Sequence, residues 1–192
     1  MTIMQIILLA ASAFFAFKIY EHMQGLQDPD GSEEANEAIE ERVNIDALVE
    51  EADRAYDAGR LLEARELLQK AHDHDSSIPE LANRLGFILS AMGNNEEALK
   101  LYNHSLSLKE EDVTHLAIAS QLRTLGRLDE SQEHYKRAIE LDPEYEVTYF
   151  NYANLLVEMK HIAEAKMMYE KALVIEPQLE AAQEELDKLN GK

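Results

Sequence analysis

The sequence predicts an all-α protein in which pairs of helices repeat along the chain, preceded by one transmembrane helix. Two observations indicate the repeat. The phrase AGRLLEA at 58–64 returns in altered form as MGNNEEA, LGRLDES and MKHIAEA, at intervals of 34, 33 and 34 residues. Each copy also keeps small residues at the same three places. A third observation, an apolar stretch at 1–17, predicts the transmembrane helix.

The first element is the apolar stretch MTIMQIILLAASAFFAF, which contains no charged side chain before Lys18. As a helix it extends about 25 Å, enough to span a thin or locally thinned bilayer. Tyr20 and His22 are, like Lys18, typical of the membrane interface. We therefore expect an uncleaved anchor at 1–20, with a cleaved signal peptide as the alternative. Because Lys18 follows the span, the positive-inside rule puts the rest of the chain in the cytoplasm.

The second element is an acidic, flexible linker at 21–43. Within it, 24–41 reads QGLQDPDGSEEANEAIEE, which combines turn residues with a dense run of carboxylates. Such a segment has too few apolar residues to form a core, and its like charges repel one another. We expect an extended spacer between the membrane and the repeats.

Small side chains recur at three positions in each repeat, separated by 12 and then by 7 residues. Small residues let two helices approach closely, so we expect the first and second of each set to face each other where paired helices cross. The third lies where one pair meets the next. The twelve residues are Ala52, Ala64, Ala71, Gly86, Ala98, Ser105, Ala119, Ser131, Ala138, Ala153, Ala165 and Ala172.

These positions divide a repeat domain, 44–192, into four helix-turn-helix units and a closing helix. The expected units are 45–78, 79–111, 112–145 and 146–177, and the expected capping helix is 178–190. The last segment carries Leu179, Ala182, Leu186 and Leu189 on one stripe. A helix with one apolar and one polar face is what a stack of repeats needs at its end.

The turns between paired helices carry glycine where the first helix ends. Glycine adopts left-handed backbone without steric cost, and it is common just beyond a helix. The turn glycines are Gly59, Gly93 and Gly126. Lys160 takes this place in the fourth unit, so we expect its turn to be strained by up to about 1 kcal/mol or to be built differently. Asn95 and Asp129 are candidate caps for the second helices.

Together these features resemble those of the tetratricopeptide repeat (TPR) family. The segments NRLGFIL at 83–89 and YKRAIELDPE at 135–144 are especially typical, and the resemblance extends over about 45–177. It implies a TPR-type helical solenoid of four helix-turn-helix units plus the C-terminal capping helix. It also implies a protein-binding role rather than an enzymatic one.

In this family the first helices line a concave groove that receives a segment of another protein. The resemblance implies a lining of Val49, Asp53, Tyr56, Asn83, Phe87, Ser90, Val113, Leu116, Ser120, Arg123, Val147, Phe150, Asn154 and Val157. Some members hold the carboxylate end of a chaperone with basic and amide side chains, which are missing here at Val49, Asp53, Val113 and Ala117.

We instead expect five apolar lining residues to form a hydrophobic strip that binds an amphipathic helix of a partner. These residues are Phe87, Val113, Leu116, Val147 and Phe150. Alternatively, these side chains pack between first helices and present nothing to a partner. A further possibility is that the chain's own spacer, 24–41, occupies the groove until a partner displaces it.

Composition excludes several function classes. The 192 residues include 38 acidic and 18 basic side chains, for a net charge of -20, so nucleic acid is not an expected partner. The absence of cysteine excludes thiolate metal sites and cysteine nucleophiles. His72, Asp73, His74 and Asp75 favour a solvated helix end over a metal site. No catalytic motif is present, and we expect no cofactor, metal or small-molecule substrate.

The expected function is a membrane-anchored scaffold or assembly factor that holds a partner segment in its groove. Its partner would be a protein component of a membrane complex, and its membrane contact would be residues 1–20. Two alternatives remain: a stoichiometric structural subunit of a larger membrane complex, and an exported periplasmic binding module.

Overall fold

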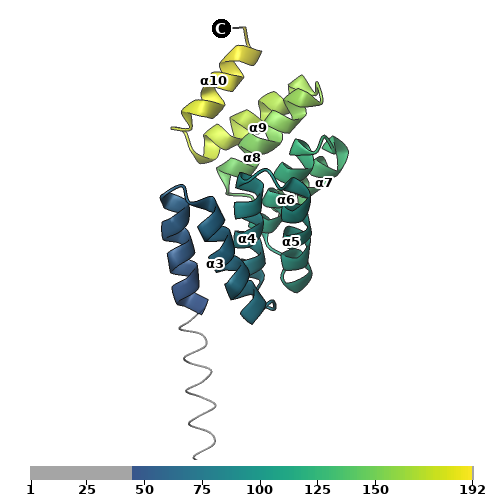
Figure 1. Ribbon diagram of the computed structural model, residues 1–192. Coiled ribbons are helices and arrows are strands. Elements are labelled where there is room, and N and C mark those ends of the chain that lie inside the picture. The colour runs from purple at the N-terminus through teal and green to yellow at the C-terminus, as the bar shows by residue number, and fades with distance from the viewer. Residues whose placement is uncertain (1–44, 192) are drawn as a thin grey trace, which may run out of the picture. The chain divides into compact units, whose positions relative to one another are not determined.

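The computed structural model describes residues 45–191, which contain nine helices and no strand (Figure 1). The first helix is 45–57. It is followed by α3 (Leu61–His74), α4 (Pro79–Ala91), α5 (Asn95–Leu108), α6 (Asp112–Thr124), α7 (Leu128–Leu141), α8 (Glu146–Glu158), α9 (Ile162–Ile175) and α10 (Glu180–Leu189). The predicted anchor, 1–20, and the predicted linker, 21–43, lie outside the described residues.

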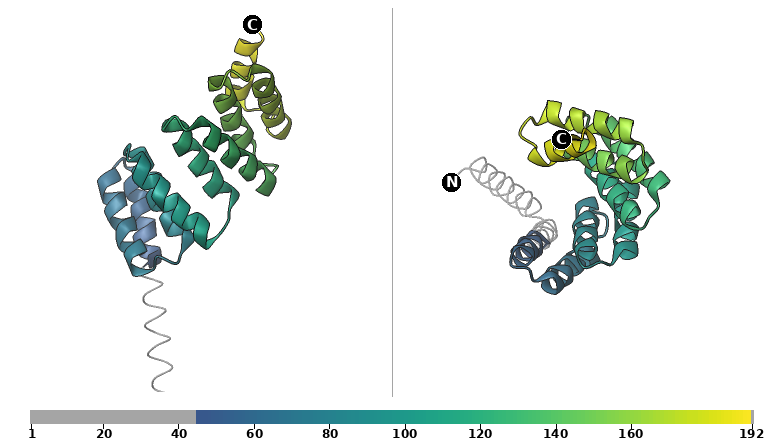
Figure 2. Two further views of the ribbon diagram at one scale, coloured as in Figure 1. Left: turned by 90° about the vertical axis from the view of Figure 1, so that its right-hand side faces the viewer. Right: turned by 90° about the horizontal axis from the view of Figure 1, so that it is seen from above.

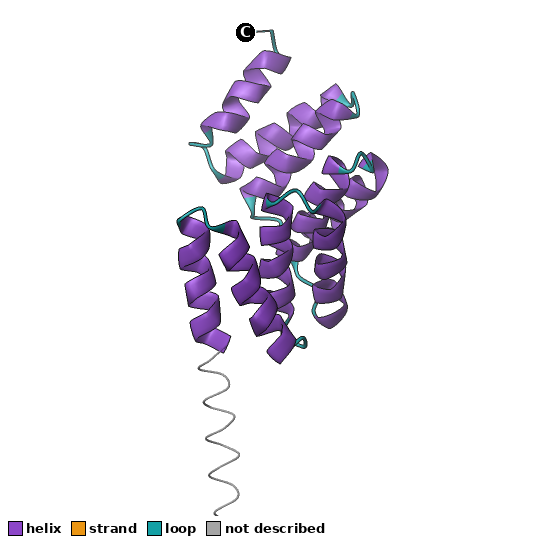
Figure 3. Cartoon of the chain, in the orientation of Figure 1, coloured by secondary structure: helices purple, strands orange, loops and turns teal. Residues whose placement is uncertain are grey.

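Within the compact unit Leu48–Lys192, helices pack against their neighbours in chain order. The pairs α4 with α5, α6 with α7 and α8 with α9 are antiparallel, and each second helix also contacts the first helix of the next pair (Figures 1 and 2). First helices contact one another as well, α4 with α6 and α6 with α8. Short loops join the helices throughout the described part (Figure 3). This arrangement is a helical solenoid.

The small residues lie at the helix contacts, as the sequence predicts. All twelve are buried. Across the α6–α7 pair, the Ser131 hydroxyl donates a hydrogen bond to the Ala119 carbonyl over 2.7 Å, so these two positions face each other. At Gly86 the fit is tighter still, because an added Cβ would lie 2.9 Å from the Tyr102 ring. Small side chains are therefore required by the distance between helices.

The turn residues have the left-handed backbone that the sequence predicts, and the turn at Lys160 has it as well. Gly126 has φ +74°, and its turn closes with Arg127 N–H donating to the Leu122 carbonyl over 2.8 Å. Lys160 adopts φ +65°, and His161 N–H makes the equivalent 2.8 Å bond in the fourth unit. The lysine turn is thus built like the glycine turns, and its Cβ bears the steric strain that glycine avoids.

The predicted caps at Asn95 and Asp129 are wrong. Asn95 is the first residue of α5, and Asp129 lies within the first turn of α7. Neither α5 nor α7 has a side-chain hydrogen bond at its N-cap. At α7 the N-cap residue is Arg127, whose guanidinium pairs with Glu130 at 2.6 Å. The glycine turn already fixes where the second helix begins, so no capping side chain is needed there.

The last helix covers the end of the stack. Ala182 and Leu186 of α10 are buried in one cluster with Tyr169 and Ala172 of α9. The opposite face of α10 carries charged residues, as expected of a closing helix. None of the helices described between residues 45 and 191 has the length and apolar character that crossing a bilayer requires.

Candidate functional site

The predicted lining residues lie on the four first helices, but their exposure differs. Exposed members are Asp53, Tyr56, Phe87 and Val113. Half-buried members are Val49, Asn83, Ser90, Leu116, Ser120, Arg123, Val147, Phe150, Asn154 and Val157. Phe87 and Val113 are each 50% exposed and Tyr56 is 38% exposed.

The N-terminal part of the lining encloses a cavity. The rings of Tyr56 and Phe87 meet edge to face, with centroids 5.3 Å apart. Beside them is a cavity of about 340 Å³ between helix 45–57, α3 and α4. Its walls are Ala52, Asp53, Tyr56, Leu68, Asn83, Arg84, Phe87 and Ile88. The cavity is large enough for one bulky side chain of a partner, with two aromatic rings at its mouth.

An ion-pair network borders this cavity. Arg84 donates to Asp53 over 2.7 Å and to Glu80 over 2.8 Å. Burial opposes the charged form of Arg84, but the hydrogen bonds and charges of Glu80 and Asp53 outweigh it and raise the Arg84 pKa. The guanidinium is therefore held at the cavity wall, and one negative charge remains in this group of three.

An amide of the cavity wall has one unused acceptor. Asn83 donates through Nδ2 to the Thr114 hydroxyl over 2.8 Å, which ties α4 to α6. Its Oδ1 atom is buried and has no hydrogen-bond partner among the described residues. A buried acceptor without a partner is unfavourable by about 1–3 kcal/mol.

In the C-terminal part of the lining, Val113 is exposed, but Ser120, Phe150 and Asn154 are held against tyrosines of the second helices. Ser120 lies 3.3 Å from the Tyr135 hydroxyl, and the Tyr169 hydroxyl donates to Asn154 Oδ1 over 2.6 Å. Burial raises the pKa of Tyr169 to about 12, so this hydroxyl stays neutral and remains a donor. Phe150 packs against Tyr169, with the two ring centroids 5.9 Å apart.

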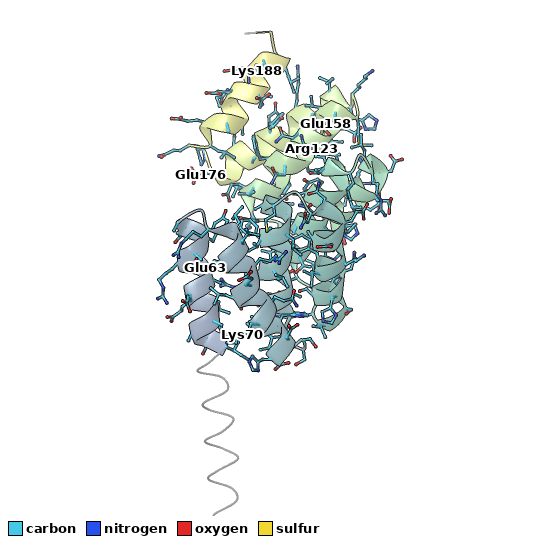
Figure 4. The ribbon with its side chains drawn as sticks, viewed as in Figure 1. Glu63, Lys70, Arg123, Glu158, Glu176 and Lys188 are labelled. Atoms are coloured by element: carbon cyan, nitrogen blue, oxygen red, sulfur yellow. The ribbon has the colours of Figure 1, made fainter. Side chains whose placement is uncertain are left out.

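Also in the C-terminal part, Arg123 of α6 and Glu158 of α8 point toward each other (Figure 4). Arg123 Nε donates to Glu158 over 2.9 Å. The hydrogen bond that Arg123 donates to Glu158 raises the Arg123 pKa, against the smaller opposing effect of burial. The pair joins neighbouring first helices and occupies lining surface that a partner would otherwise contact.

Sequence reasoning missed Arg84 and Glu158 as members of this surface, and Thr114 as the buried hydrogen-bond partner of Asn83. Asp53 and Arg84 are 31 residues apart, and Arg123 and Glu158 are 35 apart. Both separations are close to one repeat, so opposite charges at this spacing were an available signal for contacts between neighbouring units. Among the residues described, no cluster of three His, Asp or Glu side chains has the geometry to hold a metal ion.

Comparison with known sequences gives two overlapping matches. Two models of the tetratricopeptide repeat match residues 77–142 and 122–189, which together cover more than half of the chain. No curated protein matches the sequence.

Solved structures share the fold at low sequence identity. PilF of Pseudomonas aeruginosa is similar with a TM-score of 0.72 and 20% identity, over 78% of this chain and 68% of that one. MamA of Desulfovibrio magneticus RS-1 has a TM-score of 0.68 and 15% identity, over 77% and 84%. The first TPR domain of Spaghetti (RPAP3), bound to an HSP90 peptide, has a TM-score of 0.58 and 23% identity, over 61% and 94%.

Proposed function

Because this chain belongs to the tetratricopeptide repeat family, we propose that it binds a segment of a partner protein in the groove of its first two units. Proteins built from such repeats are generally interaction scaffolds rather than enzymes, and their stacked units present extended concave surfaces. The observation that carries the proposal is the cavity between helix 45–57 and α4, with the exposed rings of Tyr56 and Phe87 at its mouth.

The chemistry of the cavity indicates the kind of segment it takes. An apolar side chain of an amphipathic helix would enter beside Leu68 and Ile88 and cover the two rings. The carboxylates of Asp53 and Glu80 favour a segment that also carries Lys or Arg near its apolar residue.

We further propose that residues 1–20 anchor the chain in a membrane and that the groove serves an assembly process there. The support is the uncharged apolar run before Lys18. Anchoring would raise the local concentration of the groove for membrane-bound partners without any added contact. The repeat domain would then lie on the cytoplasmic side, the side that Lys18 favours.

The groove is tested by crosslinking in cells. A photoreactive phenylalanine analogue at Phe87 should form an adduct with one partner, identified by mass spectrometry. The matched control is the same analogue at Leu62, which is 63% exposed on α3 and lies outside the lining. Tyr56→Ala should remove the adduct at position 87. Identical adducts from both positions, or an adduct that survives Tyr56→Ala, would contradict the groove.

The affinity for a peptide of that partner gives a second measure. Phe87→Ala should weaken binding by about 2 kcal/mol, as for an aromatic residue at the centre of an interface. Leu62→Ala should leave the affinity unchanged.

The anchor is tested by fractionation. The full chain should sediment with membranes after an alkaline carbonate wash, and a variant that lacks residues 1–20 should not. Release of the full chain by carbonate would contradict the membrane anchor without contradicting the proposed groove.

A constant ratio of chain to partner through purification in mild detergent would favour a permanent subunit, and association limited to one assembly stage would favour an assembly factor.

A further inference from the structure

The outer face of α9 differs from the outer faces of the other second helices. Five residues, at 163, 167, 170, 171 and 174, fall on one side of this helix because each residue advances by about 100°. The opposite side holds Ala165, Tyr169 and Ala172, which are buried. On the outer side Met167 is 59% exposed and Val174 is 77% exposed. We call the five residues the α9 strip: Ala163, Met167, Glu170, Lys171 and Val174.

The equivalent positions in the first three units can be compared with this strip. The position of Met167 is occupied by Glu66, Lys100 and Glu133 in the first three units. The position of Val174 is occupied by Asp73, Ser107 and Glu140. All three earlier units therefore place polar or charged groups where the fourth exposes methyl and thioether groups to water. Apolar side chains seven residues apart lie on one face of a helix, and this is the spacing at which one helix packs against another.

The charges in the strip are arranged so that it complements itself. If two copies of α9 pack antiparallel about a two-fold axis between residues 170 and 171, Met167 of each meets Val174 of the other. The same rotation places each Glu170 against the other copy's Lys171. An isologous interface requires this kind of pairing, in which each contact is made twice.

The same operation on α7 would bring like charges together. Glu133 would face Glu140 of the second copy, and Lys136 would face Arg137. On α3, Glu66 would face Asp73. With a net charge of -20, two copies of this chain repel each other unless the contact is locally balanced. The α9 strip meets that condition, with one carboxylate and one ammonium per copy.

We propose that the α9 strip is a self-association surface through which two copies of this chain form a two-fold symmetric dimer. The strip faces away from the first helices, so the groove of each copy stays open in the dimer. One helix face buries less area than a standard protein interface, so we expect a weak dimer whose population depends on protein concentration.

The absence of cysteine makes the geometry directly testable. Full-length Met167→Cys and Val174→Cys chains, mixed in dodecyl maltoside and mildly oxidised, should form the mixed disulfide faster than either forms a disulfide with itself. The matched control is Glu133→Cys mixed with Glu140→Cys on α7, which should show no such preference. Equal rates for all combinations, or no disulfide at all, would overturn the proposal.

Sedimentation of the full chain over a range of concentrations tests the energetics. Met167→Glu with Val174→Glu should weaken the dimer at least about tenfold, because apolar contact is replaced by carboxylates. Glu170→Lys should weaken it by up to about tenfold, and Glu170→Lys with Lys171→Glu should restore it. Circular dichroism confirms that each variant is folded. A dimer that none of these changes affects, as expected if residues 1–17 associate instead, would also overturn the proposal.

Discussion

The first two units and the last two share a backbone plan but use the lining of their first helices differently. The residue after the first small position is Asp53, Phe87, Ser120 and Asn154 in the four units. Ser120 and Asn154 contact tyrosine hydroxyls of their own second helices. Phe87 instead extends toward solvent beside Tyr56. In the last two units these side chains are therefore held by their own unit, whereas Phe87 of the second unit remains available to a partner.

This difference shows that packing between helices and binding of a partner depend on different positions of the repeat. The small residues are buried in every unit, so each unit stacks in the same way. The neighbouring lining position is under no such constraint, and its side chain decides whether the surface is open or closed. Substitutions in the two parts can test this division.

The largest expected effect is at the small positions, where the two parts should respond alike. Ala98→Leu and Ala165→Leu should each lower the free energy of unfolding by about 1–3 kcal/mol, since both alanines are fully buried and an added isobutyl group must push helices apart. Thermal unfolding followed by circular dichroism measures the loss. If both variants unfold at the temperature of the parent chain, these positions are not contact points and the shared plan fails.

The next effect should separate the two parts. Phe150 is half-buried against Tyr169, so Phe150→Ala should lower the free energy of unfolding by about 1–2 kcal/mol. Phe87 is half exposed, so Phe87→Ala should change it by less than about 0.5 kcal/mol. Chemical denaturation of both variants makes the comparison. Equal losses would mean that Phe87 is a packing residue as well.

The turns offer a smaller test. Lys160→Gly should raise the free energy of unfolding by up to about 1 kcal/mol, because glycine relieves the strain at φ +65°. Gly126→Ala should lower it by about the same amount, since alanine would be forced to φ +74°. A neutral result for Lys160→Gly would show that the fourth turn gains as much from the lysine side chain as it loses in backbone strain.

The smallest effect should be a pH dependence of the free energy of unfolding that arises in the C-terminal part. Nδ1 atoms of His115 and His134 are 2.9 Å apart, whereas the rings of His72 and His104 are only in edge contact at 5.7 Å. Burial, followed by the charge of His115, lowers the His134 pKa below its ordinary 6.5, and Glu130 only partly opposes this.

The sign of that dependence follows from which state takes up the proton. Below about pH 6.5 the unfolded chain binds a proton at His134 more readily than the folded chain does, so stability is full above this pH and declines as the pH falls below 6.5 through the lowered pKa of folded His134. His134→Gln should flatten the decline in that window, measured by denaturation at each pH. A His104→Gln chain with the same flattening would show that the two histidine pairs are equivalent.

Much of the fold could be predicted because its signals are periodic. Small residues at fixed spacing identify helix crossings, and glycine at fixed spacing identifies left-handed turns. Capping at Asn95 and Asp129 could not be predicted reliably, since a polar residue near a helix start is common and the turn geometry had already set the boundary. The lining residues could be placed on first helices by their register, but their exposure could not be assigned.

The sequence by itself determined that helix pairs stack with a 34-residue period, because close packing restricts the same three positions in every unit. Only the tertiary structure decided which lining side chains are open. Phe87 and Phe150 both follow the helical period of their units, yet one meets water and the other meets Tyr169. Exposure depends on which neighbouring side chains reach across from other helices, and that depends on distances between helices that periodicity alone does not contain.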